Sequence, residues 1–190
     1  IFGYADGMSY GVVSASNYKA TFFDGECAVI ATDIPAEEQG TGMLFNMDGE
    51  VVGMISSSVW NDTGKNVVNA YGISDLKPII ELLINGKSVP YIGIYGTTVT
   101  EQLAEEHKMP SGIYVADVDP DSPAMVAGIQ IGDIICEASG EEIKDIAAYQ
   151  NIVIGSSVGE TMEFVGKRLG SDGYVNIKFS VVTTEKEEVK

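Results

Sequence analysis

The chain has 190 residues, of which 45% are hydrophobic, so it can bury the core of one large domain or of two small ones. A formal net charge of −17 argues against nucleic acid as a partner, because its phosphates would be repelled. No apolar run reaches the length of a membrane span. Cys27 and Cys136 lie outside any CxxC or zinc-binding spacing. We therefore expect two small buried apolar side chains there, and no metal site or cofactor.

The first third of the chain predicts short β-strands. Residues 10–15 and 27–32 are apolar runs rich in β-branched side chains, and the turn-forming pair Asp24-Gly25 lies between them. A further strand is expected over residues 50–59, preceded by the hairpin signal Asp48-Gly49. Short strands at this spacing indicate a small antiparallel barrel or sandwich.

A helix is expected directly after these strands, from Ser74 to the Asn85-Gly86 pair. Ser74 is a suitable N-cap, and Pro78 would lie in the first turn, where its missing N–H costs little. Four apolar residues at the i, i+3, i+4, i+7 spacing give the helix one hydrophobic face. They are Leu76, Ile79, Ile80 and Leu83.

The second half mixes strands with short helices. Thr100 can cap a short helix that ends at Met109-Pro110, and a strand is expected over residues 113–118. Residues 144–153 predict an amphipathic helix. Residues 162–182 predict a hairpin that turns at residues 170–173.

Residues 38–55 resemble the nucleophile segment of trypsin-like serine proteases of the HtrA family. That family reads Gly-Asn-Ser-Gly-Gly-Pro-Leu-Val-Asn before a similar Asp-Gly hairpin. Between Asp33 and Leu44 this chain is one residue shorter than the family pattern, and the position of the nucleophilic serine falls on Gly40. The residues that keep the pattern are Leu44, Asn46, Asp48, Gly49, Glu50 and Gly53.

The resemblance extends along the whole chain and implies a mainly β fold with a few helices. Residues 1–73 are similar to the second β-barrel of a trypsin-like protease, residues 74–90 to a connecting helix and linker, and residues 91–184 to a PDZ domain. Residues 185–190 would be a charged tail. The most specific match is the run from Ser122-Pro123-Ala124 to Gly132-Asp133-Ile134.

The resemblance implies a serine endopeptidase, but this chain departs from it at the nucleophile. Gly40 has no side chain, and Thr41 could attack a substrate only if the shortened loop shifts its register. The only histidine, His107, is expected on a solvated helix end, because charged residues surround it in Glu105-Glu106-His107-Lys108. In the family, the histidine and aspartate of the active site come from the first barrel. We therefore expect no catalytic residue and an inactive homologue. The alternative is an active endopeptidase with Thr41 as nucleophile and an upstream histidine and aspartate.

The PDZ-like half keeps a function that needs no reactive group. In that family of domains, backbone N–H groups capture a terminal carboxylate and the peptide adds as a β-strand. The matching positions here are Tyr91, Ile92, Gly93 and Ile94, and Tyr149 and Ile152 would line the pocket for the last side chain unless they belong to the core. The implied partners are peptides or unfolded-protein C-termini, in an extracytoplasmic and membrane-associated role in protein quality control. A third reading is a structural regulator that assembles with itself or with active homologues.

Overall fold

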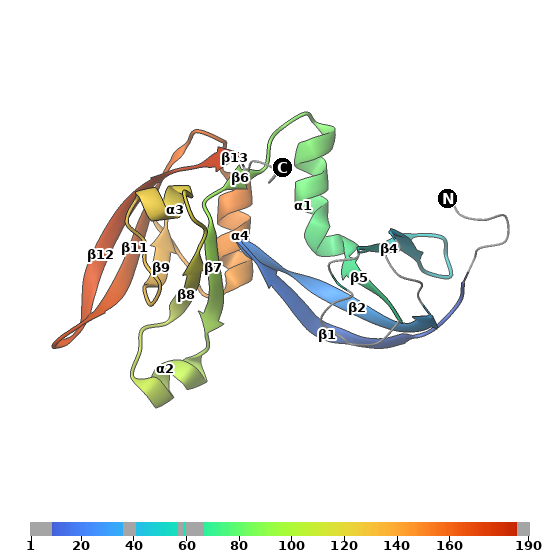
Figure 1. Ribbon diagram of the computed structural model, residues 1–190, viewed down its shortest axis with the longest axis horizontal. Coiled ribbons are helices and arrows are strands. Elements are labelled where there is room, and N and C mark those ends of the chain that lie inside the picture. Colours follow the sequence, from blue (N-terminus) through green and yellow to red (C-terminus); the bar gives the residue numbers. More distant parts are fainter. Residues whose placement is uncertain (1–8, 36–40, 57–58, 60–66, 186–190) are drawn as a thin grey trace. The chain divides into compact units, whose positions relative to one another are not determined.

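The computed structural model describes residues 9–35, 41–56, 59 and 67–185, and the chain falls into two compact units (Figure 1). The first unit comprises residues 1–20 and 27–80, and the second comprises residues 21–26 and 81–190. The predicted mainly β fold with a few helices is confirmed. The predicted domain limits at residues 73 and 91 stay a prediction. Between the barrel-like part and the rest of the chain, the boundary of the two compact units falls between residues 80 and 81.

The first unit is built on an antiparallel sheet. In the described residues its strand order is β1-β2-β5-β4-β3, with β1 and β3 at the edges. Buried apolar side chains on β2 and β5, including Val29 and Ala70, pack its centre. The strands are β1 Val13–Phe22, β2 Gly25–Pro35, β3 Gly42–Phe45, β4 Val51–Ile55 and β5 Val67–Gly72.

The turn between β3 and β4 explains why the family pattern is kept there. Asn46 Oδ1 accepts hydrogen bonds from the backbone N–H groups of Asp48 at 3.0 Å and Glu50 at 2.9 Å. Asn46 Nδ2 donates to Glu50 Oε2 at 2.8 Å, and Gly49 supplies a φ of 80°. These residues therefore close a hairpin, as predicted, and their chemistry is that of a turn.

Helix α1 differs from its prediction at the start. It runs Ile73–Ile84, so Ser74 lies inside the helix and is not its N-cap. Pro78 then falls in the second turn, beyond the position where a missing N–H is free of cost. The carboxylate of Asp75, in the first turn, accepts from the backbone N–H of Ala28 on β2 at 2.7 Å. This bond ties the helix to the sheet of the first unit.

The two cysteines are free thiols in different surroundings. Cys27 is buried on β2, as predicted, whereas Cys136 is only half-buried. Burial, with a smaller contribution from the charge of Asp75, raises the pKa of Cys27 to about 11. Burial also raises the pKa of Cys136. Both thiols therefore stay protonated at neutral pH and lack the thiolate that a nucleophile needs.

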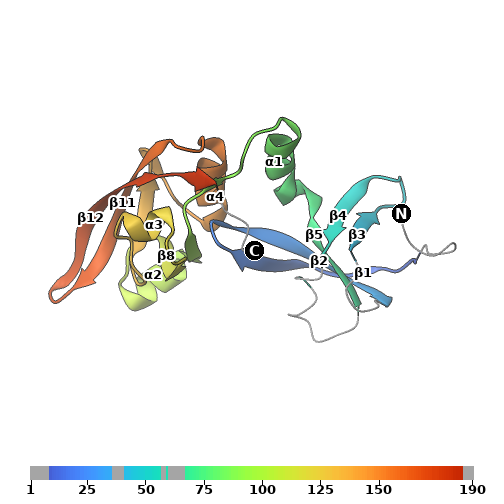
Figure 2. The same cartoon turned by 45° about the horizontal axis from the view of Figure 1, so that its top comes forward.

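The second unit is a sheet of order β12-β11-β9-β8-β7, with the short β10 paired to β9 and helix α4 lying along β7 (Figures 1 and 2). A separate pair, β6 with β13, joins the two ends of the unit. The strands are β6 Pro90–Tyr91, β7 Ile94–Val99, β8 Gly112–Val118, β9 Ile134–Ala138, β10 Glu141–Glu142, β11 Thr161–Gly170, β12 Gly173–Val182 and β13 Thr184–Glu185. The helices are α2 Glu101–His107, α3 Pro123–Val126 and α4 Ile146–Gly155.

Local signals placed most of these elements correctly. Thr100 caps α2 by accepting from the N–H of Leu103 at 3.3 Å, and the β11–β12 hairpin turns between Gly170 and Gly173, both as predicted. Helix α4 begins two residues later than predicted, because Asp145 is its N-cap and accepts from Ala148 N at 2.7 Å. In the part of the chain that the structure describes, no helix is long and apolar enough to cross a membrane.

Candidate functional site

The turn that leads into β7 presents three backbone N–H groups in a row. The carbonyl of Ile92 accepts from Ala124 N and that of Gly93 accepts from Asp119 N, both at 2.9 Å, so helix α3 and the loop before it hold this turn. The side chains of Ile92 and Ile94 are fully buried in the core of the unit. Gly93 has a φ of +94°, a conformation that favours glycine. The N–H groups of residues 92–94 take no part in these two bonds.

A carboxylate already occupies these three N–H groups, and it is the side chain of Asp24. Asp24 Oδ2 accepts from Ile92 N and Gly93 N at 2.7 Å each, and Oδ1 accepts from Ile94 N at 3.0 Å. The hydroxyl of Tyr149, on α4, donates to Asp24 Oδ1 at 2.6 Å. Asp24 is only 8% exposed. Four donors thus converge on one buried carboxylate.

The residues beside Asp24 also fit the edge of β7. We call residues 21–26, the end of the β1–β2 hairpin, the hairpin tip; these residues belong to the second compact unit. Asp24 N donates to the carbonyl of Ile94 at 2.7 Å, and Glu26 N donates to Oε1 of Gln150, on α4, at 3.1 Å. The ring of Phe23 meets that of Tyr95 edge to face, with centroids 5.8 Å apart. The hairpin tip therefore bonds to both β7 and α4.

Burial and hydrogen bonding act in opposite directions on this carboxyl. Burial raises the pKa of Asp24 above its ordinary value, while the bonds from Tyr149 and from the amides of residues 92–94 lower it. The pKa of Tyr149 is raised well above its ordinary value, first by burial and then by the charge of Asp24. Tyr149 therefore keeps its proton at neutral pH and acts as a hydrogen-bond donor.

Tyr91 supports the turn from the side. Its hydroxyl donates to Asp119 Oδ2, and its pKa is raised by burial and by that bond. The same hydroxyl packs against Gly93, since a Cβ placed on Gly93 would lie 2.9 Å from it. The structure thus brings five of the predicted peptide-site residues together: Tyr91, Ile92, Gly93, Ile94 and Tyr149.

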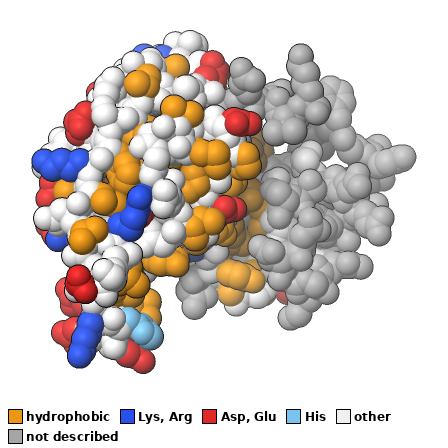
Figure 3. Space-filling model, turned by 60° about the vertical axis from the view of Figure 1, so that its left-hand side comes forward, with side chains coloured by type: hydrophobic (Ala, Val, Ile, Leu, Met, Phe, Trp, Pro, Cys, Tyr) orange, Lys and Arg blue, Asp and Glu red, His pale blue; other side chains and the backbone are white. Residues whose placement is uncertain are grey.

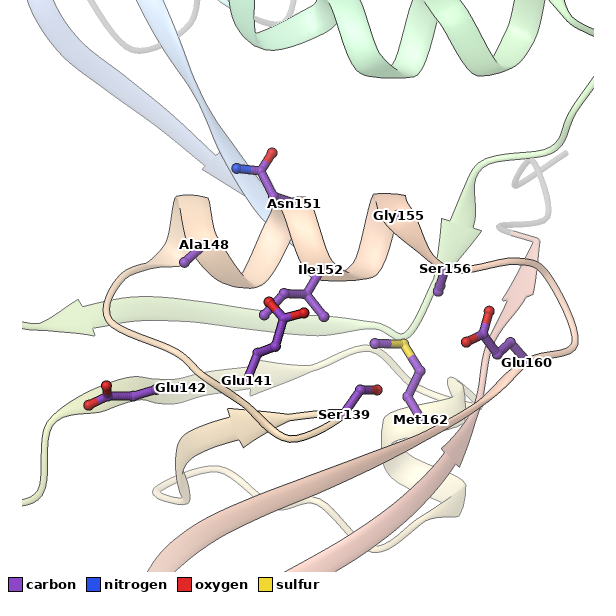
Figure 4. Close-up of a pocket in the computed structure, with 10 residues that line it drawn as sticks. All are labelled: Ser139, Glu141, Glu142, Ala148, Asn151, Ile152, Gly155, Ser156, Glu160 and Met162. Carbon is purple, nitrogen blue, oxygen red and sulfur yellow. The ribbon is translucent and has the colours of Figure 1, made fainter.

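Ile152, the sixth predicted residue, lies elsewhere. It is half-buried on α4 and lines a pocket together with Met162, Glu141 and Glu160 (Figure 4). No hydrogen bond or ring contact links this pocket to Asp24 in the described residues.

Two residues of the site were not foreseen from the sequence. The sequence predicts Asp24 as part of a turn only, and it indicates no role for Gln150. One signal was available, because Phe22 and Phe23 directly precede the Asp24-Gly25 turn, where an exposed hairpin would carry polar residues. Both phenylalanines are half-buried.

The residues that the sequence analysis weighs for a protease active site are Gly40, Thr41 and His107. Gly40 lies outside the described residues, as do residues 186–190 of the charged tail. Thr41 is exposed immediately before β3. His107, the sole histidine, is the last residue of α2 and is exposed as predicted; its pale blue side chain stands at the surface among charged groups (Figure 3).

Comparison with known proteins agrees with this architecture. The family model described as "PDZ domain" matches residues 114–168. The chain is 30% identical over 183 residues to a "Probable periplasmic serine endoprotease DegP-like" of Halomonas elongata, covering 93% of this chain and 38% of that protein. It is 30% identical over 174 residues to the "Serine protease Do-like HtrA" of Bacillus subtilis, covering 84% of this chain and 38% of that protein. The chain thus spans about two-fifths of the length of the curated relatives it matches.

Solved structures share the fold. The structure "HtrA-type protease AlgW with tripeptide" has a TM-score of 0.62 at 21% identity and covers 99% of this chain and 63% of that one. The serine endoprotease of Yersinia pestis has a TM-score of 0.53 at 25% identity, covering 93% of this chain and 56% of that one.

Proposed function

The chain belongs to the HtrA family of serine proteases and carries a PDZ domain, and from this premise we propose that it binds the C-termini of peptides or unfolded proteins. One observation carries the proposal. The three N–H groups at Ile92, Gly93 and Ile94, with the hydroxyl of Tyr149, form a site that accommodates a carboxylate. A peptide's terminal carboxylate presents the same two oxygens.

The neighbouring strand supports the same proposal. In the described residues β7 is an edge strand of its sheet, so its outer side can pair with an added strand. The peptide would continue from the carboxylate site along β7, between that strand and α4. Hydrogen bonds from N–H groups to an ionised carboxylate are stronger than neutral ones, so the terminal group would contribute much of the affinity.

The test is a calorimetric titration with one apolar peptide in two forms, a free C-terminus and an amidated one. We expect the free acid to bind at least about tenfold more tightly, because amidation removes the charge from hydrogen bonds worth about 1.5–3 kcal/mol each. The titration should extend to millimolar peptide, because Asp24 occupies the same N–H groups. Equal affinity for the two forms would contradict the proposal, as would no binding of either form to both the wild-type chain and its Asp24→Ala variant.

We also propose that the barrel does not cleave its ligands. The position of the family's nucleophile is Gly40, which has no side chain, in a loop one residue shorter than the family pattern. Relatives are named periplasmic, which supports an extracytoplasmic location. A part in protein quality control there is our proposal from the family resemblance.

A fluorophosphonate probe tests this second statement. The native protein, purified from its source cells, is expected to give no covalent adduct and no cleavage of casein, while an active HtrA-type protease handled in parallel gives both. An adduct mapped to Thr41 by mass spectrometry would establish that residue as a nucleophile and refute our statement.

A further inference from the structure

The carboxylate site of the PDZ unit is filled by a side chain of the same polypeptide. All three N–H groups of residues 92–94 are bonded to Asp24, and none is left for a second carboxylate. We propose that the hairpin tip, residues 21–26, is an internal ligand of this groove, and that a peptide C-terminus must displace it in order to bind. This inference rests on the proposed function, because it names the competitor at the same site.

The hairpin tip reproduces both parts of the contact expected for a peptide. Asp24 provides the carboxylate, held by three N–H groups and the Tyr149 hydroxyl. Its backbone N–H donates to the carbonyl of Ile94, the first bond that a strand added to β7 would make. A residue that merely braced a loop would need only one of these contacts.

The fit of the surrounding residues is close as well. Gly25 is buried, and a Cβ added to it would lie 2.5 Å from Gln150 Cδ, so its backbone approaches the helix closely. Phe23 reaches the ring of Tyr95, the second residue of β7. The contacts therefore extend on both sides of the carboxylate, to α4 and along β7.

Two features limit how tightly the hairpin tip can hold. Asp24 has a φ of 62°, a left-handed conformation that costs energy for a residue with a Cβ. Its carboxylate is also removed from water, and the donors that surround it are neutral. The desolvation cost falls equally on a peptide's terminal carboxylate, but the cost of the left-handed backbone belongs to the hairpin tip alone. That cost is recovered when the tip leaves, so a peptide that presents a carboxylate can compete.

The first experiment compares the affinity of one free-carboxylate apolar peptide for the wild-type chain and for Asp24→Ala. If the tip is displaced from about a tenth of the molecules or fewer, its removal strengthens peptide binding by about tenfold or more, because the apparent dissociation constant scales inversely with the open fraction. Asp172→Ala is the matched control, since Asp172 is an exposed turn aspartate of the same unit and its removal changes the net charge equally. We expect its affinity to equal that of the wild type.

The second experiment needs no peptide. Hydrogen exchange at the amides of Ile92, Gly93 and Ile94 should be slow in the wild-type chain and at least about tenfold faster in Asp24→Ala. Asp24→Asn should be intermediate, because its amide keeps one acceptor oxygen and loses the charge. It also serves if Asp24→Ala fails to fold.

The outcomes separate the two proposals. Equal protection of the three amides in the wild type and both variants would show that Asp24 is not their partner and overturn the internal ligand. If the three amides exchange faster in Asp24→Ala but its peptide affinity is unchanged or weaker, the hairpin tip does not compete with the peptide. Faster exchange without any peptide binding to any of the proteins would refute the proposed function, while the docked tip stands.

Discussion

Replacing Arg168 by methionine is expected to lower the free energy of unfolding of the second unit by roughly 2–4 kcal/mol. Asp133 is fully buried, and Arg168 binds both of its oxygens, with Nε at 2.6 Å from Oδ1 and Nη2 at 2.8 Å from Oδ2. Removal of the arginine leaves a buried carboxylate whose other bond comes from the N–H of Gln130. Removing one partner of a fully buried ion pair costs about 3–5 kcal/mol. The loss expected here is somewhat smaller because the Arg168 side chain is 33% exposed.

The position of Arg168 explains why one side chain has this effect. It lies on β11, and its guanidinium also donates to the carbonyl of Gly128 at 3.0 Å and stands 5.9 Å from the centre of the Phe179 ring. It therefore links β11 with the loop between α3 and β9 and with β12. Methionine keeps the length of the stem and removes all of the donors.

Hydrogen exchange at β9 and β11 amides, measured against denaturant, separates the second unit from the first and checks this expectation. Lys167→Met is the matched control, because the neighbouring Lys167 bonds to an exposed partner, Asn176. Its loss should cost less than about 1 kcal/mol. Equal effects of the two substitutions would show that the buried pair has no special role.

The features that the sequence predicts correctly are stabilised by contacts between residues only a few positions apart. The Asp48-Gly49 hairpin is closed by Asn46 and Glu50, and the Thr100 cap reaches only to Leu103. Both can be read from a short window. The start of α1 differs from its prediction because a short window shows Ser74 as a good capping residue but does not show the tertiary bond between Asp75 and Ala28.

The role of Asp24 could not be predicted from spacing. Its side-chain partners lie 68, 69, 70 and 125 residues further along the chain. Within its own neighbourhood an Asp-Gly pair between two strands is fully explained as a turn. What the sequence did predict was the receiving side, the N–H groups of Ile92, Gly93 and Ile94, because the resemblance to PDZ domains placed them.

Tyr149 and Ile152 show the limit of a helical face as a predictor. They are three residues apart on α4, and residues at this spacing lie on adjacent parts of the helix surface. Tyr149 reaches the carboxylate through its hydroxyl, whereas Ile152 lines the pocket with Met162 (Figure 4). Neighbouring residues on the apolar side of α4 can therefore contact different parts of the protein. The sequence alone does not predict which residue contacts which part.

Gly93→Ala is expected to remove the carboxylate site and to destabilise the second unit by about 3 kcal/mol or more. The φ of +94° disfavours any side chain, and a Cβ would lie 2.4 Å from Ser122 Cβ and 2.7 Å from its Oγ. Ser122 has little room to move, because it is buried and caps α3 by accepting from Met125 N at 3.3 Å. The turn must then rotate, which withdraws the N–H groups of residues 92–94 from the carboxylate.

Gly140→Ala separates backbone strain from collision. Gly140 has a φ of +84° in the same unit, and nothing lies within 4 Å of a Cβ placed on it. Its substitution should cost about 1 kcal/mol, from the left-handed conformation alone, and should leave the affinity for a free-carboxylate peptide unchanged. In Gly93→Ala that affinity should be lost, along with the slow exchange of the three amides. Full peptide binding by Gly93→Ala would mean that the carboxylate is captured elsewhere, since a turn that has rotated away from Asp24 cannot hold a peptide in its place.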